Sequence, residues 1–467
     1  MVTMSAARLA DLLNGEVVFG MPQTVFSGVD VDTRTLARGM AFFALPGEKA
    51  DGNLFVADAA RAGARVAIVS RFDEAAAAAL ADTSVAVVLV SDVGDALRAL
   101  AAHHRGTLRC PVIGITGSTG KTSTKDFLVA ALGPERSVVA TRGNRNNELG
   151  VPLTVLEAGP KTGVLVVEMG MRAEMEIEAL CTIARPSCGI VTNIGQTHLE
   201  TLGTQEAIVR AKGELVACVP PSGRLFLNGD DAWSRSLQER ASAPVTWYGM
   251  DAGVDVRATD LVVDELGRPS FTVHAAGSEA RVSLPLPGRH HAYTAAAAAA
   301  AALYLGEDLS DIAARLADVR VTGMRMQVFL AANGITVVND AYNANPTSMR
   351  AAVDALADMR AAGVRVAALG DMAELGSLTE LAHFRIGEAV ARSGIERLVT
   401  VGERARRIAE GAVAEGMPAD AVRPCSNVDE ASEVLDDLLV AGDVVLVKAS
   451  RSMGLERIVE RILARDA

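Results

Sequence analysis

Short apolar runs alternate with longer amphipathic stretches from Pro111 to about Val321. This alternation is typical of βαβ units, in which helices cover both faces of a parallel sheet. The pattern starts again after Met324. Its strand-like runs are 335–339, 366–369, 398–401 and 444–447, and its helical stretches include 347–362 and 429–439. Two α/β domains with doubly wound sheets are therefore predicted.

The first part of the chain differs from these two regions. It begins with a short amphipathic helix that ends at Asn14 and Gly15, and it contains strand-like runs such as Val66–Val69. A chain of 467 residues is long enough for three domains of ordinary size. The predicted fold class is α/β, with a small N-terminal domain (1–108), a central phosphate-loop domain with a parallel sheet (109–322) and a C-terminal Rossmann-like domain (323–467).

Composition narrows the class of protein. Half of the residues are hydrophobic but only 4% are aromatic, so the cores must consist largely of small aliphatic side chains. The alanine run at 295–302 predicts one tightly packed helix that is too short to span a membrane. A net charge of −12 argues against broad nucleic-acid binding, and five scattered cysteines suggest neither disulfides nor zinc. We expect a cytoplasmic protein without membrane insertion, by default a monomer.

The strongest local motif follows an apolar strand that starts at Pro111. It is glycine-rich and leads into a helix that ends near Gly133. Such a turn lets backbone N–H groups face a phosphate, while a lysine reaches the terminal phosphates and a hydroxyl binds magnesium. Its glycines are two residues closer together than in the common phosphate loop, so a chance turn remains an alternative. The candidate nucleotide-binding residues are Gly117, Ser118, Thr119, Gly120, Lys121, Thr122 and Ser123.

Potential metal ligands follow the next two apolar strands. Glu168 and His198 would lie in the same crevice, because the carboxyl ends of parallel strands share one edge of a sheet. For His198 alone, a hydrogen-bonded loop histidine is the plainer interpretation. Lys212 and Glu214 lie on a helical stretch, where residue chemistry by itself favours a solvated surface.

The order and spacing of these motifs resemble the Mur ligases over nearly the whole chain. The matching segments are 116–122, 168–170, 192–200, 212–214, 227–231, 288–290, 324–325, 340–346, 370–376 and 447–451. Segments 143–153, 342–346 and 370–376 are similar to those of the members that add D-alanyl-D-alanine. The resemblance implies an ATP-dependent ligase that joins D-alanyl-D-alanine to UDP-N-acetylmuramoyl-tripeptide through an acyl phosphate, in peptidoglycan precursor synthesis.

The resemblance also implies roles for individual residues. Lys121 would hold the phosphates of ATP, Thr122 and Glu168 one Mg²⁺, and His198 a second. Relatives carry a carbamylated lysine at the position of Lys212, which would turn that side chain into an anion beside the metals.

Further residues are implied for the nucleotide and the two substrates. The nucleotide would contact Asn228, His290, Arg325 and Asp340. The UDP-sugar peptide would contact Thr33, Arg34, Asn146 and Asn147, and the dipeptide would contact Asn343, Asn345 and Ser348. Relatives usually have asparagines where this chain has His291 and Thr294, so no adenine contact is carried over to these two positions.

Two other functions fit part of the pattern. One is another amide ligase of the same family, such as a diaminopimelate-adding or folylpolyglutamate-forming enzyme. The other is a phosphate-loop kinase or ATP-dependent switch without ligation. Phosphate release that requires both a carboxylate and an amine would separate a ligase from a switch.

Overall fold

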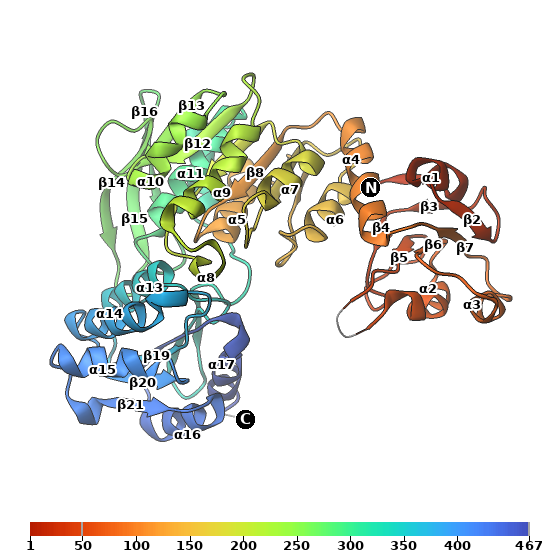
Figure 1. The fold of residues 1–467 in the computed structure, drawn as a ribbon. Helices are drawn as coiled ribbons and strands as arrows, with labels where there is room; N and C mark the ends of the chain where they lie inside the picture. Colours follow the sequence, from red (N-terminus) through yellow and green to blue (C-terminus); the bar gives the residue numbers. More distant parts are fainter. Residues whose placement is uncertain (48–49, 466–467) are drawn as a thin grey trace.

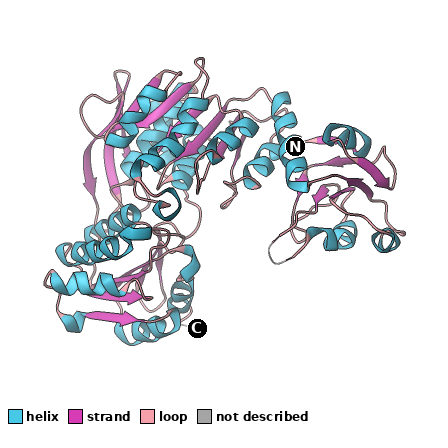
Figure 2. Cartoon of the chain, in the orientation of Figure 1, coloured by secondary structure: helices cyan, strands magenta, loops and turns pink. Residues whose placement is uncertain are grey.

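The computed structural model describes residues 1–47 and 50–465 and contains three α/β regions in chain order (Figure 1). Their principal sheets have five, nine and six strands. In the central and third regions helices lie on both faces of the sheet (Figure 2). The predicted three-part α/β fold class is confirmed. None of the helices within the described ranges is long and apolar enough to span a membrane.

The first region combines a small two-stranded sheet with a five-stranded one. The antiparallel pair is β1 (Thr3–Ser5) and β3 (Val25–Ser27). The five-stranded sheet has the order β2 (Glu16–Phe19), β7 (Ala86–Leu89), β6 (Val66–Val69), β5 (Ala41–Phe43), β4 (Val29–Asp30). The helices are α1 (Ala6–Leu13), η1 (Gly52–Phe55), α2 (Val56–Ala62), α3 (Glu74–Ala79) and α4 (Val93–Thr107). Asn14 caps α1 in the left-handed conformation, as its sequence predicts.

Helix α4 joins the first region to the central one. It packs against α1 on one side and against α6 and α7 of the central region on the other. His104 reaches the carbonyl of Ala158 at 2.8 Å, and Arg105 Nε donates to the carbonyl of Ala184 at 2.7 Å. Buried residues of both regions consequently form one continuous hydrophobic core around α4.

The central sheet has nine strands and positions the phosphate loop. Its order is β16 (Ser278–Ser283), β15 (Pro269–Ala275), β14 (Val256–Val263), β13 (Val245–Gly249), β12 (Arg224–Asn228), β11 (Cys188–Val191), β8 (Val112–Thr116), β10 (Val164–Glu168), β9 (Val138–Ala140). The chain continues from β8 to strands on one side of it and later to strands on the other, which makes β8 the switch point where open α/β sheets bind ligands. The helices are α5 (Lys121–Leu132), α6 (Gly150–Glu157), α7 (Glu176–Ala184), α8 (Leu199–Leu202), α9 (Gln205–Cys218), α10 (Ala232–Ser236), η2 (Leu237–Arg240), α11 (His291–Tyr304) and α12 (Leu309–Leu316).

The alanine run forms the predicted helix, α11. Every residue from 295 to 302 is at most 2% exposed, because α11 packs between α5 and the strands of the central sheet. Alanine suits this place, since its methyl group lets the helix axis approach both neighbours closely.

The third region has a six-stranded sheet. Its order is β17 (Gln327–Leu330), β18 (Thr336–Asn339), β22 (Val444–Lys448), β19 (Arg365–Gly370), β20 (Arg397–Val401), β21 (Val422–Cys425). The helices are α13 (Pro346–Asp358), η3 (Gly376–Leu378), α14 (Thr379–Arg392), α15 (Arg406–Ala414), η4 (Ala419–Ala421), α16 (Val428–Leu438), η5 (Arg451–Met453) and α17 (Glu456–Leu463). The four strands predicted here are present, and α13 ends four residues earlier than predicted.

The predicted parallel sheet of the central region is extended at one edge by antiparallel strands that were not predicted. Strands β14, β15 and β16 form an antiparallel meander that extends the parallel part. Their alternating burial is the pattern of a sheet with one solvated face, and a count of apolar runs does not distinguish it from βαβ units. The edge strand β17 of the third sheet is also antiparallel to its neighbour.

Candidate active site

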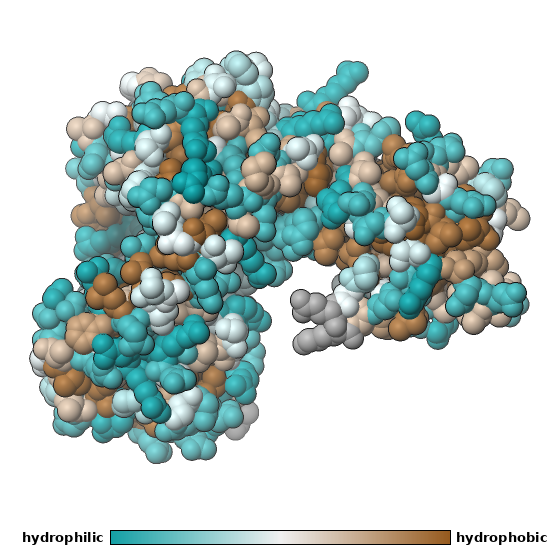
Figure 3. Space-filling view, in the orientation of Figure 1, coloured by the Kyte–Doolittle hydropathy of each residue, from teal (hydrophilic) through white to brown (hydrophobic). Residues whose placement is uncertain are grey.

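A cavity of about 1120 Å³ lies where the central and third regions face each other. The space-filling view shows the molecule hollowed between its third and first regions, below the central one (Figure 3). Most predicted site residues line this cavity. They are Ser118, Thr119, Gly120, Lys121, Thr122, Ser123, Asn146, Asn147, Glu168, His198, Lys212, Asn228, His290, Arg325, Asp340, Asn343, Asn345 and Ser348.

The phosphate loop connects β8 to α5. Gly120 has a φ of 79° and caps α5, so its conformation favours glycine. The loop is anchored by the residues that follow β11: the N–H of Thr119 donates to Asn193 Oδ1 at 3.1 Å, and Thr192 Oγ1 donates to the carbonyl of Thr119 at 2.6 Å. Lys121 Nζ donates to the carbonyl of Gly117 at 2.7 Å, which points the ammonium along its own loop. Burial lowers the pKa of Lys121, while the Glu168 carboxylate opposes this shift.

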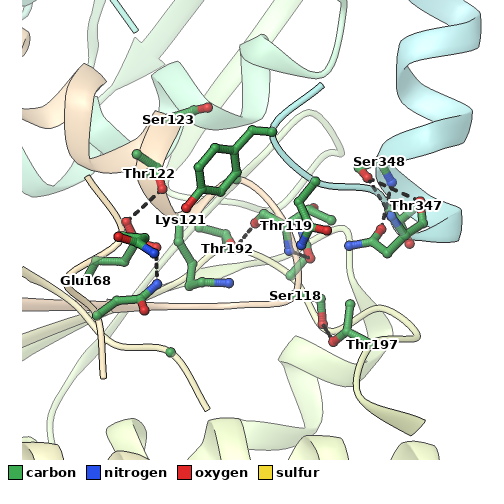
Figure 4. Close-up of a pocket in the computed structure, with 18 of the residues that line it drawn as sticks. Ser118, Thr119, Lys121, Thr122, Ser123, Glu168, Thr192, Thr197, Thr347 and Ser348 are labelled. Atoms are coloured by element: carbon green, nitrogen blue, oxygen red, sulfur yellow. Dashed lines mark hydrogen bonds between the residues drawn. The ribbon is translucent and has the colours of Figure 1, made fainter. Parts of the chain in front are cut away.

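Glu168 and Thr122 form a pair of oxygen donors beside this loop. Thr122 Oγ1 donates to Glu168 Oε2 at 2.7 Å, and Asn146 Nδ2 donates to Glu168 Oε1 at 2.8 Å (Figure 4). Carboxylate and hydroxyl oxygens are the ligands that Mg²⁺ prefers, and Mg²⁺ commonly takes only one or two of them from the protein. Within 1–47 and 50–465 no group of three or more His, Cys, Asp or Glu side chains is suited to a metal. The residues present fit a magnesium ion that is also coordinated by phosphates.

His198 lies where the third region meets the central one. Its backbone is left-handed (φ 56°), and its Nδ1 lies 2.6 Å from Glu374 Oε2 on the loop after β19. The proximity of the His198 side chain lowers the pKa of Glu374. Glu374 belongs to the segment 370–376 that resembles the Mur ligases, but no role was predicted for its side chain. Its contact with His198 holds the two regions together at the edge of the cavity.

Lys212 is buried on α9 with 2% exposure, which excludes a solvated surface for it. Burial lowers the pKa of Lys212 well below its ordinary value, and the nearby Lys121 ammonium lowers it further. Burial and the Lys121 charge both disfavour the ammonium form of this side chain. Glu214 has a different task, because its carboxylate accepts the N–H groups of Met175 (2.6 Å) and Glu178 (3.0 Å) at the start of α7.

Two predicted nucleotide-binding residues come from the third region. Arg325 Nη2 donates to Thr122 Oγ1 at 3.0 Å, and the guanidinium lies 3.9 Å from the centre of the Tyr342 ring. Asp340 forms a 2.5 Å ion pair with Lys448 and accepts the N–H of Met326 at 3.1 Å. Asp340 thus holds both Lys448 and the backbone of Met326. Lys448 also lines the cavity, and it was not predicted as a site residue.

The predicted dipeptide residues lie at the start of α13. Asn345 Oδ1 accepts the N–H of Ser348 at 2.9 Å, and Ser348 Oγ accepts the N–H of Asn345 at 3.1 Å, which is a capping box. Figure 4 shows Thr347 and Ser348 on the side of the pocket away from Thr122 and Glu168. Asn343 Oδ1 accepts the N–H of Ala344 at 2.9 Å. These side chains therefore shape the loop as well as line the cavity.

Asn228 and two histidines line another part of the cavity. Asn228 Nδ2 donates to the carbonyl of Thr192 at 3.1 Å. The His290 and His291 rings are 4.1 Å apart, and burial lowers the pKa of His290 to about 4. Both ring nitrogens of His291 lack hydrogen-bond partners among the residues that the structure describes. His291 and Thr294, for which no role was predicted, also line the cavity.

Thr33 and Arg34 lie elsewhere. They belong to a turn of the first region in which Arg34 pairs with Asp32 at 2.6 Å, and neither lines the cavity that the described residues form. This pair holds the pKa of Asp32 at about 2.

Comparisons with known proteins agree with this arrangement. Residues 25–105 match the Mur ligase family catalytic domain, 115–302 the Mur ligase middle domain, and 324–451 the Mur ligase glutamate ligase domain. The chain is 37% identical to the UDP-N-acetylmuramoyl-tripeptide--D-alanyl-D-alanine ligase of Bacillus subtilis, over 99% of each chain.

Two solved structures have a similar fold over their whole length. MurF of Acinetobacter baumannii has a TM-score of 0.87 at 31% identity, with 99% of both chains covered. The MurF ligase of Thermotoga maritima in complex with ADP has a TM-score of 0.80 at 28% identity, covering 94% of this chain and 99% of that one. From its motifs, its three-part fold and these full-length matches, this chain belongs to the Mur ligase family.

Proposed function

We propose that this chain is an ATP-dependent ligase that joins D-alanyl-D-alanine to UDP-N-acetylmuramoyl-tripeptide in peptidoglycan precursor synthesis. The observation that carries the proposal is that one cavity contains the phosphate loop, Arg325 from the third region and the asparagine loop before α13. Such a cavity has room for a nucleotide, a carboxylate acceptor and an amine. The full-length similarity to the Bacillus subtilis ligase supports the choice of these substrates.

The nucleotide is ATP, held at its phosphates by the loop 117–123 and by Lys121. Thr122 and Glu168 would hold one Mg²⁺, and His198 with Lys212 would hold a second. Bound Mg²⁺ would neutralise the charge that develops on the phosphoryl oxygens. Asn228, His290, Arg325 and Asp340 would surround the rest of the nucleotide.

Lys212 would take part as a carbamate. An uncharged buried amine can attack CO₂ to give a carbamate and a proton, and the lowered pKa of Lys212 favours the uncharged amine. The carbamate is an anion and is attracted by the Lys121 ammonium, whereas the ammonium form of Lys212 would be repelled by it.

The reaction has two steps. The terminal carboxylate of the tripeptide attacks the γ-phosphorus of ATP, so an acyl phosphate forms and ADP leaves. The amine of D-alanyl-D-alanine then attacks the acyl carbon, the C–O bond to phosphate breaks, and the amine loses its proton. Lys121 and Arg325 would stabilise charge on the transferred group, and closure of the third region over the central one would keep water from the acyl phosphate.

The three parts of the chain would divide the substrates among them. Residues 1–108 would bind the UDP end through Thr33 and Arg34, and 109–322 would bind ATP. Residues 323–467 would bind the dipeptide through Asn343, Asn345 and Ser348. Asn146 and Asn147 would meet the peptide near the phosphate loop. We place the enzyme in the cytoplasm, as a monomer.

Phosphate release tests the proposal. The unmodified chain is mixed with ATP, Mg²⁺ and UDP-N-acetylmuramoyl-tripeptide, and D-alanyl-D-alanine is compared with diaminopimelate, lysine and glutamate. Release that depends on both the tripeptide and D-alanyl-D-alanine is the expected result. Release only with one of the other amines would assign a different ligase of the family, and release that needs neither substrate would indicate a switch.

A further inference from the structure

The linker between the central and third regions, residues 322–326, starts in contact with α5, the helix that follows the phosphate loop. Thr322 donates its N–H to Asp126 Oδ2 at 2.7 Å and its hydroxyl to Asp126 Oδ1 at 3.2 Å, so both carboxylate oxygens hold one residue. The Asp126 side chain is only 12% exposed and pairs with Lys125 at 2.8 Å. Lys125 Nζ in turn donates to the carbonyl of Thr141 at 3.0 Å. The start of the linker is thus fixed in a largely buried polar cluster of α5.

The other end of the linker reaches the same face of α5. Asp126 follows Thr122 by four residues, so the two side chains project from one face about 6 Å apart along the helix axis. Arg325 contacts Thr122 and Thr322 contacts Asp126. The linker therefore runs antiparallel to the first turns of α5, and three residues are long enough to cover this distance.

Arg325 stands between two residues with unusual backbones. Met324 has a φ of 59° and Met326 a φ of 48°. This left-handed backbone conformation is unfavourable for residues other than glycine, so neighbouring contacts must stabilise it. Here the N–H of Met324 donates to Gln327 Oε1 at 2.8 Å, and the carbonyl of Met324 accepts the N–H of Tyr342 at 3.2 Å. These contacts fix the third-region side of Arg325, while Asp126 fixes the central side.

One N–H donor group of the Arg325 guanidinium is unpaired among the described residues. Arg325 Nη1 is buried and has no hydrogen-bond partner in the described part of the chain, although it lies at a cavity that Lys121 also lines. A buried guanidinium N–H without a partner is costly, and a phosphate oxygen is its natural acceptor.

We infer that Asp126 is a positioning residue: it fastens the interdomain linker to the phosphate-loop helix and thereby places Arg325 at the transferred phosphoryl group. The inference rests on the proposed function, because that function supplies the phosphoryl group. Asp126 itself lies one helical turn beyond the metal-binding hydroxyl and touches no substrate.

A double-mutant cycle tests it, with kcat and the KM for ATP measured separately. Arg325→Ala should lower kcat about 100-fold, the usual cost of losing a charged contact to the transition state. Asp126→Ala should lower kcat about 10-fold, since small misplacements of a catalytic group cost this much or more, with little change in KM. In the Arg325→Ala background the same change should cost less than about twofold, because its effect passes through the missing guanidinium.

Asp358→Ala is the matched control. It breaks the 2.6 Å pair between Arg289 of the central region and Asp358 of the third, which is an interdomain contact remote from the linker. Its effect on kcat should be the same factor in both backgrounds. If Asp126→Ala destabilises the fold, Thr322→Val replaces it. Valine keeps the backbone N–H and leaves the Asp126–Lys125 ion pair in place, and it removes the two hydrogen bonds of the hydroxyl, to Asp126 Oδ1 and from Lys125 Nζ (3.5 Å).

Hydrogen exchange of the segment 322–326 with ADP bound gives a readout that needs no ligation. Asp126→Ala should speed this exchange, and Asp358→Ala should leave it unchanged. Any one of three results would overturn the inference. Asp126→Ala could lower kcat by the same factor in both backgrounds, Arg325→Ala could leave kcat unchanged, or Asp126→Ala could leave the hydrogen exchange of 322–326 unchanged. If the unmodified chain releases no phosphate with its three substrates, the proposed function fails, and the exchange result alone then decides whether Asp126 anchors the linker.

Discussion

Gly117→Ala should disable the phosphate loop through one misplaced methyl group. A Cβ at this position would lie 1.8 Å from Thr192 Oγ1 and 3.0 Å from Thr192 Cβ, and the φ of Gly117 is +147°. Contacts below about 3.0 Å do not persist, so the loop or Thr192 must move by about 1.2 Å. Thr192 cannot yield freely, because its hydroxyl donates to the carbonyl of Thr119 within the same loop.

A displacement of about 1 Å at a catalytic group costs about 100-fold in rate, or roughly 3 kcal/mol of activation free energy. We therefore expect the kcat of Gly117→Ala to fall at least 100-fold in the phosphate-release assay. ADP affinity, measured by calorimetry, should fall as well, because the backbone N–H groups that face the phosphates move with the loop.

Gly203→Ala separates backbone strain from the clash. Gly203, at the end of α8, also has a positive φ, of +77°, but no atom lies within 4 Å of the place that an added methyl group would take. This variant should lose about 1 kcal/mol of unfolding free energy and keep its activity within about twofold. A Gly117→Ala enzyme within threefold of the unmodified rate, at equal thermal stability, would refute the reasoning.

Three other changes probe the site. Lys212→Ala should lose most of its activity and regain part of it with added acetate or formate. Bicarbonate should raise the activity of the dilute unmodified enzyme. Full activity of Lys212→Ala without additives would contradict a role for a Lys212 carbamate. Glu168→Gln should lower kcat about 100-fold and raise the Mg²⁺ concentration for half-maximal rate, and an unchanged Mg²⁺ titration would contradict the metal role. His290 stays uncharged in the folded chain because burial lowers its pKa to about 4. The unfolded chain therefore binds the extra proton below pH 6.5, and urea unfolding should show about 2 kcal/mol less stability at pH 4.5 than at pH 7 from this residue. His290→Gln should reduce that loss, and equal losses in both proteins would contradict it.

Much of the phosphate site could be predicted because it is local in sequence. The strand, the glycine turn and the first turn of α5 are continuous, and the carboxyl ends of neighbouring parallel strands bring Glu168 and His198 to the same edge. Only the fold class of the third region followed from its apolar pattern. The contacts of Arg325 and Glu374 with the central region depend on how two folded parts meet, and no periodicity encodes that.

Lys212 shows a signal that residue chemistry alone overlooks. Ile208, Ala211 and Leu215 are buried on α9, and Lys212 occupies the position between them at helical spacing. A lysine within an apolar stripe is unusual enough to suggest a function for its amine. By contrast, the strands of the antiparallel meander β14 to β16 alternate apolar and polar residues, as β15 does, and a search for continuous apolar runs overlooks that pattern.

The buried alanine helix limits how this chain can vary. Most helices have a solvated side that accepts substitutions freely, but residues 295–302 of α11 have none. The helix is enclosed by α5, α12 and the strands of the sheet, so a larger side chain in this run would have to displace one of these neighbours. Sequence drift in this segment is therefore confined to residues as small as alanine, and its low complexity is a consequence of geometry.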